Sequence, residues 1–374
     1  MKTAEKLANA EQKLNATLIE RHEEVAICLT ALAMGEHALL VAPPGTGKSF
    51  LAEMLGDLLS GNVFRIQLSK TTEVEELVGP MDLAEFKQGR YRRRAEGKMP
   101  NATVALLDEV FKGSSAVLNV TLSMLQERRW FDGTTVRDVP LRCAIGTSNE
   151  FPDPQNGGKE LAALFDRFLF RQVSREVDSL SGTRRLMFED IRPVSWDATE
   201  RISDEELAAA QSEIDAVQIT PEIEESLLVL VDELAQEGVR PGDRRRRKSA
   251  RVCRAAAWRR GSAEVEPCDL HLLAHTLYSD PEQRLLCAER VVGISDVDTR
   301  KLLEHVHDLD ELDGKIDGMD PTKSETRDLV LRMGHTVNEM KKLNTPKLAQ
   351  YLEPCRARYN RRREWVERSR MPVV

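Results

Sequence analysis

Residues 42–49 read Ala-Pro-Pro-Gly-Thr-Gly-Lys-Ser and lie between an apolar stretch, Ala38 to Val41, and a helix-like stretch, Phe50 to Leu59. A strand that leads through a glycine-rich turn into a helix directs backbone amides and the positive end of the helix dipole at a phosphate group. This is the layout of a phosphate-binding loop, and it predicts that the chain binds a nucleoside triphosphate. An ordinary turn is the alternative, and Ala42, where a glycine is usual, departs from the pattern.

The chemistry of the loop assigns roles to its last two residues. Lys48 can reach the β- and γ-phosphates, and the Ser49 hydroxyl can ligate Mg²⁺. The residues expected to hold the nucleotide are Pro44, Gly45, Thr46, Gly47, Lys48 and Ser49.

In a second motif downstream, the carboxylates of Asp108 and Glu109 directly follow four apolar residues, Val104 to Leu107. In this position Asp108 is expected to hold the Mg²⁺ shell, and Glu109 to orient and polarise the attacking water. An aspartate that caps the next helix is the alternative. The presence of a phosphate loop upstream favours the hydrolytic interpretation.

Composition sets outer limits. With 374 residues, the chain is long enough for two or three domains with a substantial core. A net charge of −8 argues against a protein that coats nucleic acid indiscriminately, although it leaves room for local basic patches. The six cysteines are far apart without a Cys-x-x-Cys pair, and no segment approaches ~18 consecutive apolar residues. We therefore expect a cytoplasmic protein without an export signal or membrane span.

The order of apolar segments predicts the domain organisation. After a helical region from Thr3 to Gly35, short apolar runs alternate with helical patterns, which is typical of a parallel sheet covered by helices. We therefore expect an α/β nucleotide-binding core over residues 1–195. Its strands are expected at Ala38 to Val41, Val63 to Leu68, Val104 to Leu107 and Arg142 to Thr147.

The rest of the chain is expected to be mainly helical. Residues 200–280 show only helical patterns from Asp204 to Tyr278. In the final part, residues 281–374, the stretch from Asp296 to Pro321 is dense in Asp and Glu and is expected to be an acidic linker or loop. Beyond it, apolar residues at spacings of three and four predict two short antiparallel helices. These residues are Val330, Met333, Val337 and Met340, then Leu348, Leu352, Cys355 and Tyr359.

Three further segments give the chain a resemblance to the AAA+ ATPases, and to the RavA-like branch of the MoxR family in particular. Asn149 ends another buried strand and resembles the sensor-1 residue of these enzymes. Leu164 to Phe168 resembles the segment that carries their arginine finger, here Arg167. Gly242 to Arg245 stands where the family places its sensor-2 arginine, although its Gly-Asp-Arg sequence replaces Ser-x-Arg. Either Arg244 or Arg245 is expected to contact the γ-phosphate from the subunit's own lid.

Two segments resemble inserts of this family. Glu85 to Arg93 is expected to form a hairpin with a glycine turn and resembles the helix-2 insert. Arg129 to Asp138 has an Asp-Gly turn between β-forming residues and resembles the pre-sensor-1 hairpin. In the family such hairpins face the central pore or a partner, which makes four aromatic residues candidate contacts unless they pack within the hairpins. These are Phe86, Tyr91, Trp130 and Phe131.

The resemblance implies an α/β fold of the AAA+ type, with an αβα sandwich around a parallel sheet, an all-α lid and a C-terminal helical extension. It implies ATP and Mg²⁺ as ligands, and a homo-oligomeric ring, expected to be a hexamer, in which a neighbour's Arg167 acts in trans. Arg171, four residues later, is the alternative finger. The implied partner is a protein with a von Willebrand A domain, and the implied role is the remodelling, maturation or activation of a protein complex.

Two other functions stay open. A nucleic-acid motor or loader is favoured only by the arginine-rich start of the expected lid helix, a basic run without interleaved stacking aromatics, so we expect no nucleic-acid partner. A nucleotide-gated scaffold in a defence or stress complex would turn over little ATP. The full set of hydrolytic residues argues against that scaffold.

Overall fold

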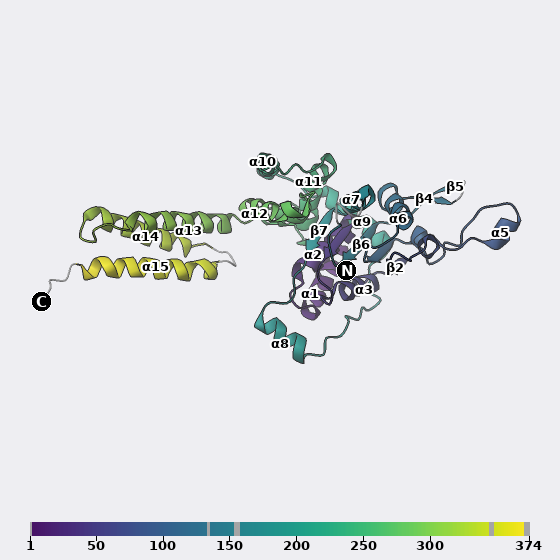
Figure 1. Ribbon diagram of the computed structural model, residues 1–374, viewed down its shortest axis with the longest axis horizontal. Coiled ribbons are helices and arrows are strands. Elements are labelled where there is room, and N and C mark those ends of the chain that lie inside the picture. The colour runs from purple at the N-terminus through teal and green to yellow at the C-terminus, as the bar shows by residue number, and fades with distance from the viewer. Residues whose placement is uncertain (1, 133–134, 153–157, 344–347, 370–374) are drawn as a thin grey trace. The chain divides into compact units, whose positions relative to one another are not determined.

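The computed structural model describes residues 2–132, 135–152, 158–343 and 348–369. The chain divides into two compact units, Met1–Cys287 and Ala288–Val374 (Figure 1). The expected α/β core with a parallel sheet and a helical lid is confirmed, and both lie in the first unit. The domain boundaries expected near residues 195–200 and 280 stay predictions. No helix in the described ranges combines the length and apolar character that a membrane span needs.

A five-stranded sheet in the order β2-β3-β6-β1-β7 forms the centre of the first unit, and all of its strands run parallel. The middle strands are buried along their whole length, which explains why they read as continuous apolar runs rather than alternating patterns. The strands are β1 (Ala38–Val41), β2 (Val63–Gln67), β3 (Val104–Asp108), β6 (Cys143–Ser148) and β7 (Phe170–Val173). The sequence predicted the first four; β7 was missed because its four residues include Arg171 and Gln172.

Helices cover the sheet and connect its strands. The core contains α1 (Thr3–Thr17), α2 (His22–Met34), α3 (Lys48–Asp57), α4 (Val74–Val78), α5 (Leu83–Lys87), η1 (Met99–Asn101), α6 (Ser115–Glu127), α7 (Gly158–Arg167) and α8 (Leu180–Phe188). Of these, α2 packs against β1, β6 and β7, whereas α3 packs against β3 and β6. The N-terminal helices therefore help to build the core and do not form a separate arm.

The two expected hairpins have different outcomes. Arg129 to Asp138 forms an antiparallel pair, β4 (Arg129–Asp132) and β5 (Thr135–Asp138), as predicted, with Gly133 of its turn outside the described residues. The prediction for Glu85 to Arg93 was wrong in its first arm, which is the helix α5. Asp82 caps this helix by accepting hydrogen bonds from the amides of Ala84 and Glu85, so a helical turn satisfies the backbone there.

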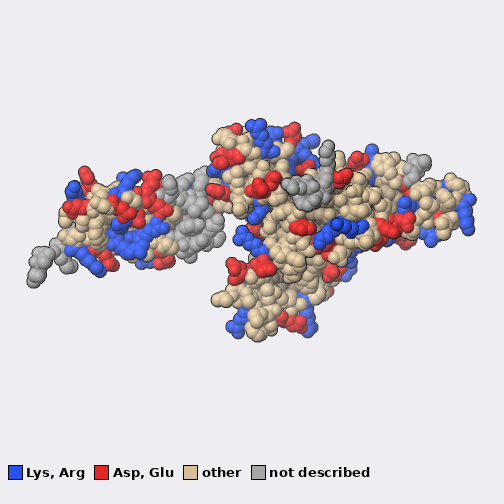
Figure 2. All heavy atoms as spheres, in the orientation of Figure 1, with Lys and Arg blue, Asp and Glu red and all other residues tan. Residues whose placement is uncertain are grey.

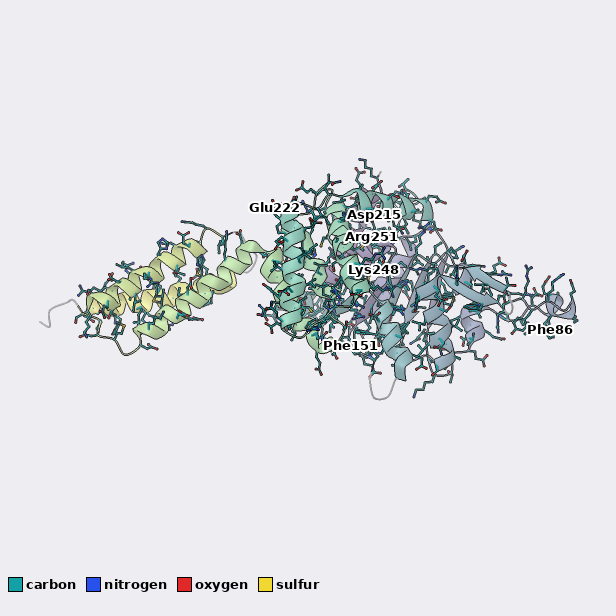
Figure 3. All side chains as sticks on the ribbon, turned by 90° about the horizontal axis from the view of Figure 1, so that it is seen from above. Phe86, Phe151, Asp215, Glu222, Lys248 and Arg251 are labelled. Carbon is teal, nitrogen blue, oxygen red and sulfur yellow. The ribbon has the colours of Figure 1, made fainter. Side chains whose placement is uncertain are left out.

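The lid follows with α9 (Asp204–Ala216), α10 (Pro221–Gln236), α11 (Asp243–Arg259) and the 3₁₀ segments η2 (Pro267–His275) and η3 (Pro281–Gln283). Helix α11 lies along the amino-terminal edge of the sheet. Lys248 Nζ pairs with Glu36 at 2.5 Å, directly before β1, and Arg251 Nη1 donates to Met34 O at 3.0 Å (Figure 3). The lid thus contacts the edge opposite to the one where the strands end.

The second unit contains α13 (Val297–Ile316), α14 (Ser324–Met340) and α15 (Leu348–Arg368), and α12 (Arg284–Ser295) leads into it. The expectation of an acidic linker at Asp296 to Pro321 was wrong, because Leu309, Leu312 and Ile316 recur at helical spacing and face a shared core. The acidic residues occupy the other face of α13, where Asp313 pairs with Arg362 of α15 at 2.6 Å. The two predicted helices, α14 and α15, are present and pack with α13.

Candidate functional site

The phosphate loop connects β1 to α3. Gly45 and Gly47 have φ angles of 80° and 83°, in the left-handed region that favours glycine, and a Cβ at either position would meet nothing within 4 Å. The two glycines are therefore required by the backbone conformation and not by crowding. Gly47 precedes the first residue of α3, so the amides at the start of that helix open into the loop.

Lys48 bridges the loop and the end of a neighbouring strand. Its Nζ donates to Ala42 O at 2.6 Å, to Pro43 O at 2.9 Å and to Asn149 Oδ1 at 3.0 Å. Burial lowers the pKa of Lys48, although the nearby carboxylates of Glu109 and Asp108 act to raise it. The ammonium group is thus held at the mouth of the loop, next to the polar end of β6.

Ser49 and Asp108 come together as expected for a pair of magnesium ligands. Ser49 Oγ lies 3.3 Å from Asp108 Oδ2, while Asp108 Oδ1 accepts hydrogen bonds from Thr147 Oγ1 and from the Glu109 amide. Mg²⁺ is commonly bound by only a few protein oxygens, such as those of a hydroxyl and a carboxylate. Water and substrate phosphates complete its coordination shell. These residues therefore fit the metal that the phosphate loop implies.

Glu109 and Asn149 form the third part of this group. Glu109 is buried in a left-handed backbone conformation, with φ 51°, and Asn149 Nδ2 donates to its Oε1. Its other carboxylate oxygen pairs with Lys112 Nζ at 3.2 Å. A non-glycine residue rarely adopts positive φ, so the chain tolerates local backbone strain to aim this carboxylate. Lys48, Ser49, Asp108, Glu109 and Asn149 are therefore brought together at the carboxyl-terminal edge of the sheet.

Sequence reasoning missed the cavity beside the phosphate loop. It has a volume of about 400 Å³, and the loop residues Pro44 to Gly47 form one wall. The remaining walls are largely apolar and come from segments far apart in the chain: Thr17, Leu18, Ile19, Arg21, Phe50, Glu176, Val177, Thr183, Leu186 and Ile191. No local motif marks these residues, because the cavity forms only when α1 and α8 meet the loop.

Arg21 is a second residue that the sequence did not reveal. Its Nε donates to Thr46 O at 3.0 Å and its Nη1 to Glu20 O at 2.7 Å, and the side chain is only 8% exposed. A buried guanidinium that binds a loop carbonyl holds the loop in place. A single arginine at the start of α2 carries no signal that separates it from an ordinary surface cation.

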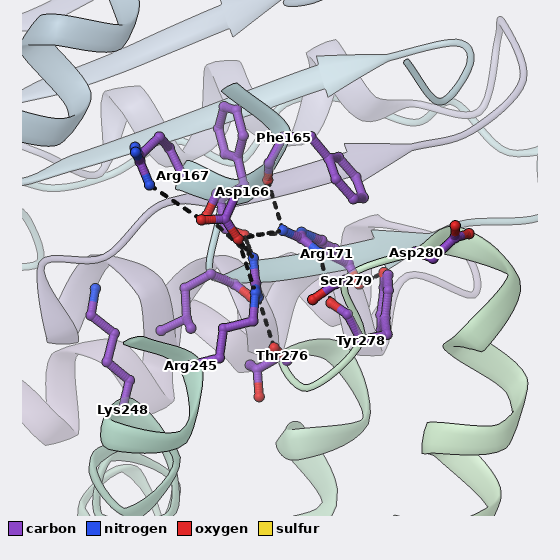
Figure 4. Close-up of polar contacts among 12 residues, drawn as sticks. Phe165, Asp166, Arg167, Arg171, Arg245, Lys248, Thr276, Tyr278, Ser279 and Asp280 are labelled. Carbon is purple, nitrogen blue, oxygen red and sulfur yellow. Dashed lines mark hydrogen bonds and ion pairs between the residues drawn. The ribbon is translucent and has the colours of Figure 1, made fainter. Parts of the chain in front are cut away.

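Arg167 lies at the opposite, amino-terminal edge of the sheet, at the end of α7. Its Nε donates to Gln126 Oε1 at 2.9 Å and its Nη1 lies 3.2 Å from Asp166 Oδ2 (Figure 4). Burial, and next the positive charge of Arg244, lower the pKa of Arg167. Because the phosphate loop follows the carboxyl end of β1, Arg167 is separated from its own loop by the length of the sheet.

Arg171 cannot serve as the alternative finger, and that expectation was wrong. Its side chain is 1% exposed, and its guanidinium donates to the carbonyls of Phe165, Phe168 and Tyr278. It also stacks over the Phe165 ring, with 3.8 Å from Cζ to the ring centroid (Figure 4). Arg171 therefore stabilises the contact between β7 and the end of the lid.

Arg245 is also engaged within the chain. It is 3% exposed and donates to Leu169 O at 3.1 Å and Thr276 O at 2.7 Å, and its Nη2 lies 3.3 Å from Asp166 Oδ1 (Figure 4). The expectation that Arg244 or Arg245 contacts the subunit's own γ-phosphate was wrong, because α11 begins at the amino-terminal edge of the sheet. Arg244 is exposed there, and its positive charge contributes to lowering the pKa of Arg167 and of Arg245.

Much of the basic run at the start of α11 is paired with carboxylates. Arg246 pairs with Asp243, Lys248 with Glu36, and Arg251 with Asp215 at 2.7 Å. The Arg251 pair joins α11 to α9 and the Lys248 pair joins α11 to the core, whereas the Arg246 pair lies within α11. Basic side chains that are already neutralised give little support for a surface that tracks a phosphate backbone.

The aromatic residues of the two inserts divide into exposed and buried groups. Phe86, Tyr91 and Phe131 are 54%, 42% and 60% exposed, and Phe86 lies at the far end of the α5 insert (Figure 3). Trp130 is only 5% exposed and packs beneath Arg137 of the facing strand. Three of the four candidate contact residues are thus accessible, and Trp130 belongs to the packing of its own hairpin.

Comparisons with known proteins agree with this geometry. Residues 5–219 match the family described as the MoxR domain in the MoxR-vWA-beta-propeller ternary systems, and residues 222–291 match an AAA lid domain. Two uncharacterized proteins of Methanocaldococcus jannaschii are 32% and 34% identical over 313 residues, which cover 83% and 82% of this chain and 81% and 78% of theirs.

A solved structure gives the same fold. The crystal structure of a candidate ATPase from Cytophaga hutchinsonii superposes with a TM-score of 0.61 at 20% identity and covers 78% of this chain and 94% of its own. The RavA-like branch stays a prediction. With a family model that spans more than half of its residues and a lid model beyond it, the chain belongs to the MoxR family of AAA+ ATPases.

Proposed function

We propose that the chain binds Mg²⁺ and ATP at the carboxyl-terminal edge of its sheet and hydrolyses ATP to ADP and phosphate. The loop amides and Lys48 bind the phosphates, and Ser49 and Asp108 hold the metal. The metal neutralises negative charge on the phosphates. Glu109 orients the attacking water, and Asn149 fixes its carboxylate through the hydrogen bond to Oε1.

The cavity beside the loop supports this proposal, since it offers a place for the base and sugar. Its apolar side chains include Leu18, Ile19 and Val177, which suit the faces of a purine, and Arg21 holds the loop through Thr46 O. Apart from Phe50 of α3, the apolar wall residues lie before α2 or after β7, so binding of the base links these segments to the phosphate loop.

The position of Arg167 is the observation that carries the proposed ring. Arg167 and Arg244 lie at the amino-terminal edge, far from the phosphate loop of the same chain. A finger that stabilises charge on a transferring phosphoryl group must approach that group. Copies arranged head to tail satisfy this need, because the amino-terminal edge of one copy then faces the nucleotide of the next. Arg167 and Arg244 are the two cations supplied in trans, and Arg245 anchors the lid.

The accessible inserts support a role in which hydrolysis acts on a partner protein. Phe86, Tyr91 and Phe131 are exposed, so the two inserts are available to contact a client. The family model is named for systems that combine a MoxR domain with von Willebrand A and β-propeller proteins. The proposed client is therefore a protein complex that contains a von Willebrand A domain, which the ring, with six copies, remodels, matures or activates.

Mixing two inactive variants tests the proposal. Arg167→Ala lacks the finger and Glu109→Gln lacks the water-orienting carboxylate, so each alone should be nearly inactive. In a mixture, some interfaces pair an intact Arg167 with an intact Glu109, and hydrolysis should partly return. The rate per subunit of the wild-type chain should also rise with protein concentration. A rate that is independent of concentration, together with no rescue in the mixture, would show that the chain acts as a monomer.

A further inference from the structure

Helix α8 exposes an unusual apolar face. Leu180, Met187 and Phe188 are 90%, 69% and 77% exposed, although large apolar side chains are normally dispersed or covered on a monomer surface. Together with the exposed Arg184 they stand at positions i, i+4, i+7 and i+8, which is one side of a helix. Figure 2 shows largely uncharged surface at this end of the core.

The other side of α8 has a different task. Thr183 and Leu186 line the cavity beside the phosphate loop. Leu186 is also 52% exposed, so the apolar residues that point outward sit on a helix that also lines the proposed nucleotide site. Ser179 caps the helix by accepting a hydrogen bond from the Gly182 amide at 2.9 Å, and its hydroxyl donates to Glu20, so the helix is anchored to the segment before α2.

A complementary face lies on lid helix α10. Leu228 is 67% exposed and Val229 is 41% exposed. Glu224, Glu225 and Asp232 are exposed at positions i−4, i−3 and i+4 relative to Leu228, and the helix contains no Lys or Arg. One helix thus offers apolar residues with an arginine, and the other offers apolar residues with carboxylates.

The two helices lie at opposite ends of the core-and-lid unit, α10 at one end and α8 at the other (Figure 1). The head-to-tail arrangement that brings Arg167 to the next copy's nucleotide turns the lid end of one copy toward the phosphate-loop end of the next. This brings α10 of the first copy toward α8 of the second. A heterologous contact of this kind repeats around a closed ring.

We propose that α8 of one copy docks on α10 of its neighbour, with Leu180, Met187 and Phe188 against Leu228 and Val229, and Arg184 among the α10 carboxylates. The inference rests on the proposed ring and identifies an apolar contact within its interface. Because the inner side of α8 covers the nucleotide cavity, nucleotide binding and docking on the neighbour act on the same helix. ATP should therefore strengthen the contact.

Two variants that each break one face provide the test. Met187→Asp with Phe188→Asp breaks the α8 face, and Leu228→Asp with Val229→Asp breaks the α10 face, each in a Glu109→Gln background that retains ATP. Because the contact would bury these apolar side chains, either double substitution should weaken association about tenfold or more. Sedimentation measures this association. Leu331→Asp, an equally exposed leucine on α14, is the matched control and should assemble normally. Unchanged thermal unfolding verifies that each variant is folded.

A mixture of the two broken variants gives the sharper result. Each copy retains one intact face, so a head-to-tail contact predicts dimers that grow no further. A charge exchange supports the same geometry: Arg184→Glu should weaken assembly, and Glu224→Arg with Glu225→Arg in the same chain should restore it.

The outcomes separate the contact from the ring. Assembly that survives both broken variants, or a mixture that stays monomeric, overturns the α8–α10 contact and leaves the ring standing. A wild-type chain that stays monomeric with ATP overturns both.

Discussion

The two edges of the central sheet carry opposite chemistry. At the carboxyl-terminal edge, Asp108 and Glu109 lie beside Lys48 and the phosphate loop, in a group suited to a nucleotide and a metal ion. At the amino-terminal edge, three arginines surround the single carboxylate of Asp166. The groups proposed to bind the nucleotide and the proposed arginine finger therefore lie at opposite edges of the same sheet. In the proposed ring, a second copy brings the two edges together.

The largest expected effect lies at the carboxyl-terminal edge. Glu109→Gln should retain ATP binding and lower kcat by about 10³-fold, because an amide cannot take a proton from the attacking water. Lys48→Ala should instead weaken ATP binding itself. Nucleotide titration and steady-state rates separate the two results, and Glu127→Gln, on the exposed end of α6, is the control. Normal turnover in Glu109→Gln would show that another group orients the water.

The second prediction concerns the amino-terminal edge. Arg244→Ala should lower kcat by about 10²-fold, the cost of removing one charged donor to a transition state. If Arg244 acts on the neighbour's nucleotide, a mixture with Glu109→Gln should regain activity. The control is Arg246→Ala, an exposed arginine of the same helix that pairs with Asp243. A mixture without rescue would contradict the action of Arg244 on the neighbour's nucleotide and break the division between the two edges.

A smaller effect is expected from the carboxylate that joins three arginines. Asp166→Asn removes the charge held between Arg167, Arg171 and Arg245, so the finger loses its support. We expect kcat to fall about tenfold with KM for ATP unchanged, and the free energy of unfolding to fall by about 1 kcal/mol, since Asp166 is half exposed. Asp243→Asn, which removes an exposed ion pair with Arg246 within the lid helix α11, should change neither quantity. A raised KM without a change in kcat would contradict the positioning role.

The smallest prediction concerns stability at the amino-terminal edge. His37 is buried beside Arg128, and its Nδ1 accepts a hydrogen bond from the Ala144 amide at 2.9 Å. Burial, and next the charge of Arg128, hold the pKa of His37 well below its usual value. As the pH falls, His37 is therefore protonated in the unfolded chain before it is protonated in the folded chain. The free energy of unfolding consequently falls below about pH 6.5, by up to about 1.4 kcal/mol per pH unit.

Denaturant unfolding between pH 7.5 and 5 measures this slope. His37→Gln should be less stable at pH 7.5 but should show a shallower decline toward pH 5. The same slope in both proteins would assign the acid sensitivity to other groups.

The sequence predicted most of the residues that meet at the carboxyl-terminal edge of the sheet and few of the contacts at its amino-terminal edge. The phosphate loop and the acidic pair are local motifs, since each is formed by consecutive residues at a strand end. The roles of Arg171 and Arg245 were misjudged because spacing along the chain says nothing of burial. Both guanidinium groups donate hydrogen bonds to backbone carbonyls of segments distant in sequence, such as those of Tyr278 and Thr276. The acidic helix α13 was misjudged because its charge density masked a regular apolar repeat.

Sequence alone determined the fold class, the phosphate loop and the carboxylates at the ends of the buried strands. These follow from short-range rules, in which glycines permit left-handed turns and apolar runs form buried strands. Tertiary structure decided which arginines are accessible, where the lid lies and which segments enclose the cavity beside the loop. Those properties depend on long-range packing, because α11 contacts the amino-terminal edge through residues distant in sequence, among them Glu36, Phe168 and Leu169.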